Sequence, residues 1–170
     1  QLHDLVDRVG FPAPTVDLNG ATGGTSYSAS FTENDNAVRM AASDATLSDD
    51  DNITGMTLAL TATPDGASET IAYSEALNGG ASLASLGLSG SYNSGARTYT
   101  VSGVASPSVY QGVLRAMVYD NASESPDTTV RTVIITVTDA EGAAGQASSA
   151  VSIIAVNDAP TATNLCLLYT

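Results

Sequence analysis

Residues 131–139 read Arg131-Thr132-Val133-Ile134-Ile135-Thr136-Val137-Thr138-Asp139. Within this stretch Val133, Ile135 and Val137 alternate with positions that are mostly threonine. An alternation of period two in β-branched residues is typical of a strand with one face on a core and the other in solvent. The same period recurs in residues 27–31 and 56–61, so the sequence predicts several half-buried β-strands.

Turn signals separate these strands from others. Asn93-Ser94-Gly95 precedes a strand that is expected from Thr98 to Val101, and the triplet predicts a hairpin turn. Residues 139–145 predict a second turn, which leads into a last strand over residues 151–156. About seven or eight short strands with turns between them indicate a β-sandwich.

One helix is expected among the strands, near residues 107–117. Ser106 is a favourable N-cap residue, and Pro107 suits the first helical position. The apolar residues that follow have helical spacing and predict one buried face, made by Val109, Tyr110, Val113, Leu114 and Met117.

The composition narrows the class of protein. The 170 residues carry a net charge of −13 and have no lysine, which disfavours binding to nucleic acid or to an anionic membrane. No stretch approaches the length of a transmembrane helix. Aspartate far outnumbers glutamate, and aspartate favours turns and calcium coordination over helix. We therefore expect a soluble, extracellular β-protein that needs divalent cations or salt.

Acidic residues cluster where strands are expected to start or stop. Calcium takes six to eight oxygen ligands from carboxylates, amides and carbonyls, and such clusters supply them. The alternative for each cluster is a solvated turn or polar linker. The predicted calcium ligands are Glu33, Asp49, Asp50, Asp51, Asn157 and Asp158, with Asp120 and Asp127 as weaker candidates.

A three-residue motif that occurs twice in the chain suggests a tandem repeat. Ala13-Pro14-Thr15 recurs as Ala159-Pro160-Thr161, and the chain between the two copies has the length of one sandwich. This predicts an N-terminal extension or the end of a preceding segment over 1–13, a sandwich over 14–158, and a linker over 159–170. The apolar run 165–169 is then either the first strand of a following repeat or a strand donated to another subunit.

The stretch from about Pro14 to Pro160 resembles the cadherin-like repeats of large bacterial surface proteins and RTX-type adhesins. The motifs that carry this resemblance are Phe31-Thr32-Glu33-Asn34, Leu47-Ser48-Asp49-Asp50-Asp51, Tyr110 to Arg115, Val118-Tyr119-Asp120-Asn121, residues 131–139, and Val156-Asn157-Asp158-Ala159-Pro160. The resemblance implies an all-β, Ig-like Greek-key sandwich on a bacterial cell surface. It also implies calcium between domains, with ligands from the Glu-Asn pair, the Asp-rich loop and the Asn-Asp linker. One departure is Phe11-Pro12, where the second junction has Asn157-Asp158.

Three functions are compatible with these features. The first is a calcium-stabilised structural repeat of an adhesin or surface fibre, whose partners are neighbouring repeats or identical subunits head to tail, with glycans or another cell surface as a further target. The second is a self-assembling extracellular filament subunit joined by strand donation. The third is a carbohydrate- or ice-binding module that would use the threonine stripes. We expect no enzyme, because the lone His3 is a poor basis for a zinc site or a Ser-His-Asp triad and no nucleotide-binding or hydrolase motif is present.

Overall fold

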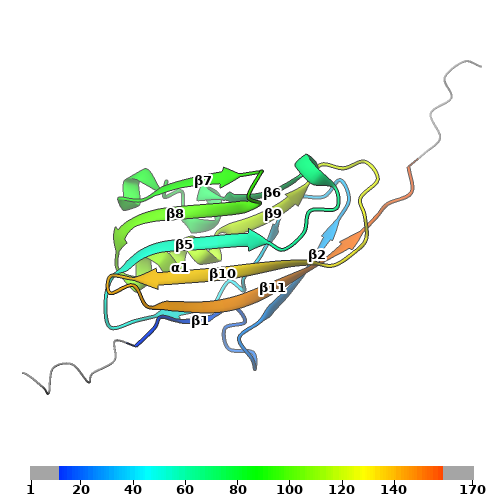
Figure 1. The fold of residues 1–170 in the computed structure, drawn as a ribbon. Coiled ribbons are helices and arrows are strands. Elements are labelled where there is room, and N and C mark those ends of the chain that lie inside the picture. Colours follow the sequence, from blue (N-terminus) through cyan, green and yellow to red (C-terminus); the bar gives the residue numbers. More distant parts are fainter. Residues whose placement is uncertain (1–11, 159–170) are drawn as a thin grey trace, which may run out of the picture.

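The computed structural model describes residues 12–158, which form two packed layers of β-structure (Figure 1). The first layer is a six-stranded sheet in the order β2-β11-β10-β5-β8-β7. Its strands are β2 (Tyr27–Thr32), β5 (Ile53–Leu60), β7 (Ser89–Asn93), β8 (Thr98–Ala105), β10 (Arg131–Asp139) and β11 (Ala144–Ile154).

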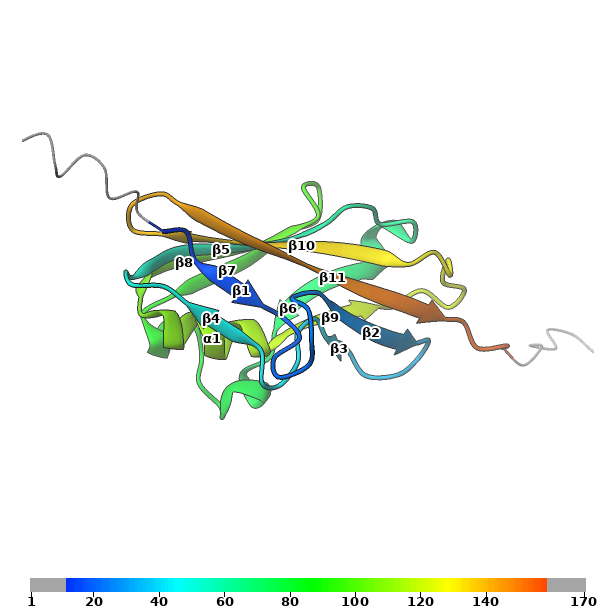
Figure 2. The ribbon, with the colours of Figure 1, turned by 90° about the horizontal axis from the view of Figure 1, so that it is seen from below.

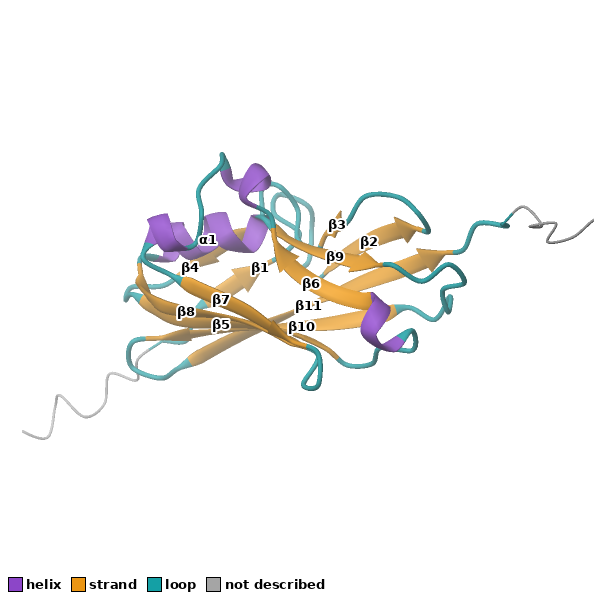
Figure 3. Cartoon of the chain, turned by 90° about the horizontal axis from the view of Figure 1, so that it is seen from above, coloured by secondary structure: helices purple, strands orange, loops and turns teal. Residues whose placement is uncertain are grey.

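The second layer contains a three-stranded sheet in the order β3-β9-β6 and a two-stranded sheet, β1-β4. Its strands are β1 (Thr15–Asp17), β3 (Val38–Arg39), β4 (Thr46–Ser48), β6 (Glu69–Tyr73) and β9 (Met117–Asn121). The helix α1 (Pro107–Arg115) lies on this side of the molecule (Figure 3). Three short 3₁₀ turns, η2 (Gly66–Ser68), η3 (Glu75–Asn78) and η4 (Ala84–Leu86), complete the connections.

The alternation in the sequence becomes an alternation of burial. Along β10, Val133, Ile135 and Val137 are fully buried, whereas the residues between them are partly exposed. The inward side chains of the two layers meet in one core, and Phe31 of β2 packs edge-on against Tyr119 of β9 with ring centroids 5.7 Å apart. Burial of the apolar face therefore fixes which side of each strand turns inward.

The connections confirm the predicted all-β Greek-key sandwich. The chain crosses between the layers after β1, β2, β4, β5, β6, β8 and β9, and among the described residues only β7–β8 and β10–β11 are hairpins of consecutive strands. Eight strands in the described part of the chain have five residues or more, and the other three have two or three. The predicted number of seven or eight thus matches the longer strands.

The predicted helix is confirmed, and it ends two residues early. α1 begins at Pro107 and ends at Arg115, because Met117 already starts β9. Tyr110, Val113 and Leu114 are its buried residues, as the apolar spacing predicted. Ser106 has the extended backbone of an N-cap residue but makes no capping hydrogen bond with its side chain.

The chain enters and leaves the sandwich at opposite ends. Residue 12, before β1, and residue 158, after β11, lie far apart along the length of the strands (Figures 1 and 2). The predicted extension over 1–13 mostly precedes the described residues, and the predicted strand over 165–169 lies wholly outside them. Within residues 12–158, no helix is long and apolar enough to cross a membrane.

Candidate metal centre

A parallel strand pair sets the position of Glu33. β2 runs parallel to β11, with Thr32 opposite Ile154, so Glu33 comes to lie beside the chain that leaves the sandwich. The Glu33 N–H donates to the Ile154 carbonyl at 2.9 Å, which extends the pairing by one residue. Asn34 then takes a φ of 65°, a left-handed conformation that asparagine adopts more readily than most residues, and the chain turns away.

The Glu33 carboxylate is buried, and only half of it is satisfied. The residue is 3% exposed, and its Oε2 accepts a hydrogen bond from the Val156 N–H at 2.7 Å. Its Oε1 is buried and receives no hydrogen bond from the described residues. An unsatisfied buried carboxylate oxygen costs about 1–3 kcal/mol or more, so a native structure that keeps one calls for an explanation.

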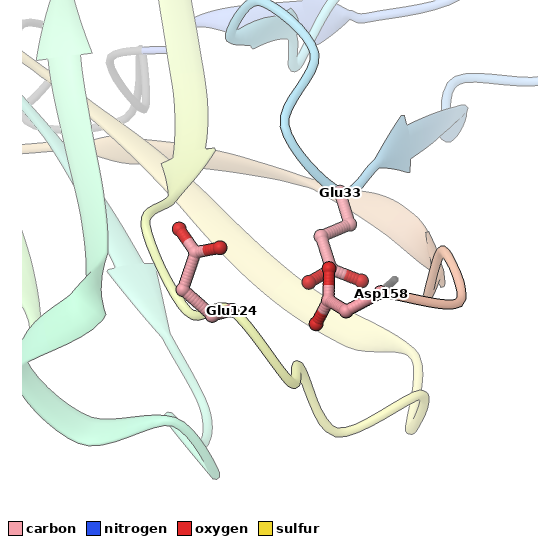
Figure 4. A group of neighbouring side chains, drawn as sticks. All are labelled: Glu33, Glu124 and Asp158. Carbon is pink, nitrogen blue, oxygen red and sulfur yellow. The ribbon is translucent and has the colours of Figure 1, made fainter. Parts of the chain in front are cut away.

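Two further carboxylates come to the same place. One oxygen each from Glu33, Glu124 and Asp158 lies within 4.8 Å of the others. Figure 4 shows that the three side chains come from separate segments: the loop after β2, the connection between β9 and β10, and the chain after β11. Glu124 and Asp158 are exposed, whereas Glu33 is buried. We call these three residues the acidic triad.

Without a cation, the acidic triad is an unfavourable arrangement. Each pair of unit charges about 4 Å apart repels by roughly 1 kcal/mol in water, and by more near a protein surface. A divalent cation between the carboxylates would replace their mutual repulsion with attraction. It would also supply the missing partner of Glu33 Oε1. Carboxylate oxygens alone, with no sulfur or imidazole, favour a hard cation such as Ca²⁺ over zinc or copper.

Two predicted ligands, Glu33 and Asp158, belong to the triad, and Asn157 adjoins them. The Asn157 side-chain amide donates to the Asp158 carbonyl at 3.2 Å. Glu124 was missed by the sequence reasoning, because it lies in a polar run, Ala122-Ser123-Glu124-Ser125-Pro126, that looks like an ordinary loop. Only the fold, which brings this connection beside β2 and β11, identifies it.

The weaker candidates Asp120 and Asp127 lie outside the triad and have other partners. The Asp120 carboxylate accepts the N–H of Asn121 at 2.9 Å. Asp127 accepts the N–H of Thr129 at 2.8 Å, and hydrogen bonding from the Thr129 side chain and then from its backbone lowers the pKa of the Asp127 carboxyl group. Asp127 also lies 3.6 Å from the Arg131 guanidinium. Both carboxylates therefore take part in contacts that need no metal.

The aspartates at 49–51 lie at the other end of the sandwich. They precede β5, whose first residue, Ile53, pairs with Asp139 at the end of β10. Burial of its carboxyl group raises the pKa of Asp49, and its Oδ2 has no hydrogen-bond partner among the described residues. The nearby Glu141 has a raised pKa because of desolvation and the charge of Asp51. We call Asp49, Asp50, Asp51 and Glu141 the entry cluster.

Asp139 has a structural role beside the entry cluster. It is 2% exposed, and its Oδ1 accepts the N–H groups of Glu141 and Ala143 at 2.9 and 2.8 Å. Gly142 takes a φ of 89° in the same turn. Asp139 and Gly142 therefore make the β10–β11 hairpin turn, as expected for an Asp–Gly turn.

One surface hollow provides a test for catalytic groups. A hollow of about 470 Å³ is lined by residues that include Tyr73, Glu75 and Tyr99. Among the described residues that line it, Glu75 is the only one with a carboxylate. General acid–base hydrolysis of a glycoside needs two carboxyl groups, so this hollow does not meet that requirement.

Comparisons with known proteins add little. No protein-family model matches the chain, and no curated protein matches it in sequence. Among solved structures, the chain is similar to the solution structure of the PKD domain from the KIAA 1837 protein, with 14% identity and a TM-score of 0.36. That match covers 84% of this chain and 100% of the PKD chain. The class of protein, a β-sandwich, therefore rests on the strand order and core described above.

Proposed function

We propose that this chain is a calcium-stabilised structural repeat of an extracellular adhesin or surface fibre. The observation that carries the proposal is the unsatisfied Oε1 of Glu33, buried within a triad of carboxylates where the chain leaves the sandwich. Ca²⁺ bound there would join the end of one sandwich to the chain that leads onward. The resemblance to cadherin-like repeats of bacterial surface proteins supports a calcium site where the chain leaves the sandwich. It also supports an extracellular location.

The chain supplies part of a calcium coordination sphere. The acidic triad offers carboxylate oxygens from Glu33, Glu124 and Asp158. Asn157, which is exposed beside Asp158, adds an amide oxygen. Since Ca²⁺ takes six to eight oxygens, carbonyl groups, water or a following domain would provide the rest. A cation shared in this way makes the angle between neighbouring domains depend on calcium.

The end of the sandwich opposite the acidic triad also carries acidic residues, which could face the triad of a neighbouring copy. The β4–β5 connection and the β10–β11 turn, which carry the entry cluster, lie at the end where the described chain enters the sandwich, and the segment after β11, which carries Asp158, leaves at the other end (Figure 1). In a head-to-tail array, the triad of one copy would face the entry cluster of the next. Each junction would then gather acids from both sides, and calcium would remove the repulsion between them.

The decisive experiment is a thermal melt in EDTA and in millimolar CaCl₂, with MgCl₂ as a control for ionic strength. Calcium at one hundred times its Kd adds about 2.7 kcal/mol to the free energy of unfolding. For a domain of this size, that corresponds to an increase in Tm of roughly 5–10 °C. Mg²⁺ should give a much smaller shift, because it demands octahedral geometry and dehydrates reluctantly. An unchanged Tm in calcium would overturn the proposal.

A further inference from the structure

A second group of charges is buried and makes hydrogen bonds to the connection that carries Glu124. Arg131, the first residue of β10, has a side chain with no exposed surface. Its Nε donates to Glu69 Oε2 at 2.8 Å, and its NH2 donates to Asp65 Oδ2 at 2.7 Å. The side chains of Tyr119 and Asn121 donate to the same two carboxylate oxygens, each at 2.8 Å. We call these five residues the Arg131 cluster.

Stability alone is a weak reason to keep such a cluster. Taking each ion out of water costs several kcal/mol, and well-packed apolar residues often serve the core as well or better. The cluster also places two carboxylates on one guanidinium, so the formal charges do not balance. The cluster also makes hydrogen bonds to residues outside it, and these indicate a second role.

These hydrogen bonds reach the connection between β9 and β10, residues 122–130. The Asp127 N–H donates to both Asp65 oxygens, at 2.9 and 3.2 Å. Arg131 NH1 donates to the Thr129 carbonyl, and Asn121 Oδ1 accepts the Ser123 N–H at 3.0 Å. The cluster therefore holds this connection at both of its ends.

Glu124 lies between two held points of the connection. It directly follows Ser123 and is three residues before Asp127, and Pro126, two residues after it, is buried. Glu124 itself is exposed, and one of its carboxylate oxygens lies within 4.8 Å of an oxygen of Glu33 and of Asp158. An exposed acid on a long surface connection would normally sample many positions, and ordering it at a cation would cost conformational entropy.

We propose that Asp65 and Arg131 are positioning residues for the cation site. They fix the β9–β10 connection so that Glu124 reaches Glu33 and Asp158 before the cation arrives. This inference rests on the proposed calcium site. It adds that Asp65 and Arg131, which do not belong to the acidic triad, preorganise the site by holding the β9–β10 connection. Preorganisation of this kind increases affinity because less ordering remains to be done on binding.

The test compares two variants of the same cluster by calcium titration calorimetry, using CaCl₂ on the full chain. Asp65→Ala removes the acceptor of the Asp127 N–H, whereas Tyr119→Phe removes only a hydroxyl that donates to Glu69. We expect Asp65→Ala to weaken calcium binding about tenfold or more. Tyr119→Phe should stay within about twofold of wild type, although it lowers the Tm measured in EDTA.

A conservative variant separates positioning from simple damage. Asp65→Asn keeps one oxygen that can accept the Asp127 N–H, so its Kd should fall between those of wild type and Asp65→Ala. Equal losses of affinity in Asp65→Ala and Tyr119→Phe would overturn the positioning role, as would an unchanged Kd in a folded Asp65→Ala protein. If wild type binds no calcium, the proposed function fails and the positioning role fails with it.

Discussion

The guanidinium of Arg131 and the carboxylate of Glu69 form a salt bridge of 2.8 Å, and neither side chain has any exposed surface. Arg131 belongs to the six-stranded sheet and Glu69 to the three-stranded sheet, so the bridge joins the two layers. Burial of the Tyr119 hydroxyl, with its hydrogen bond to Glu69, raises the pKa of that tyrosine. The bridge therefore lies in a network that spans the core at one end of the sandwich.

Arg131→Met is expected to lower the free energy of unfolding by about 3–5 kcal/mol, because it leaves Glu69 buried and unpaired. Urea denaturation at pH 7 measures this loss. The double variant Arg131→Met/Glu69→Leu removes the guanidinium and its fully buried partner and leaves only the more exposed Asp65 unpaired, so it should recover part of the stability. If the double variant is as unstable as the single one, the unpaired charge of Glu69 does not explain the loss.

Glu33→Gln is expected to abolish the calcium-induced increase in Tm. In EDTA the variant should melt at the wild-type temperature or slightly above it, because one of three mutually repelling charges is gone. Thermal melts with and without CaCl₂ provide the measurement. Asp120→Asn is the matched control, since Asp120 lies outside the acidic triad, and it should keep the full calcium response. A normal calcium response in Glu33→Gln would exclude the triad as the site.

Gly145→Ala is expected to destabilise the protein by about 1–3 kcal/mol. A Cβ at this position of β11 would collide with the backbone carbonyl of Pro14, which precedes β1 and cannot rotate away. Gly55→Ala, in β5, is the control, because its Cβ would meet only an ordinary contact with the Val101 carbonyl at 3.5 Å. Urea unfolding of both variants gives the comparison. Equal stabilities would show that β1 does not pack closely on β11.

Stability is expected to fall as the pH rises from 10 to 12. Burial raises the pKa of Tyr110 to about 12, and its hydroxyl donates to the Gly103 carbonyl at 2.6 Å. In the unfolded chain the same hydroxyl titrates near pH 10. Its contribution is therefore complete below pH 10, and it is lost as the pH passes through the folded value, because only the unfolded state releases the proton in this window.

Urea midpoints at pH 9 and pH 11.5 check this dependence. Tyr110→Phe should be less stable than wild type at pH 9, through the lost hydrogen bond, yet should lose less stability on going to pH 11.5. A Tyr110→Phe protein with the same pH dependence as wild type would assign the alkaline instability to other groups.

Much of the fold follows from local sequence pattern. The alternation around Val133, Ile135 and Val137 predicted the burial of β10, because a pleated strand repeats every two residues. Pro107 and the apolar spacing after it predicted α1 within two residues. Each of these signals depends on neighbours along the chain, so no knowledge of the tertiary structure was needed.

The candidate site was only partly accessible to the same reasoning. Glu33 and Asp158 were predicted from their positions at strand ends, and their contact depends on the parallel pairing of β2 with β11. Pairing between segments more than a hundred residues apart leaves no local trace. Glu124 and the buried charge of Arg131 were missed for that reason, since both acquire their roles from partners that are distant in sequence.

The parallel alignment of β2 and β11 also bears on how the molecule withstands tension. A pull applied between residues 12 and 158 acts along β11, while the hydrogen bonds that hold β11 lie across the direction of the force. The six registered pairs of β2 and β11 must then slip together in shear, instead of opening one after another as in a hairpin unzipped from its ends. Resistance to such a pull is governed by the unfolding rate and not by the equilibrium stability, so two domains of equal Tm can differ widely in the force they bear.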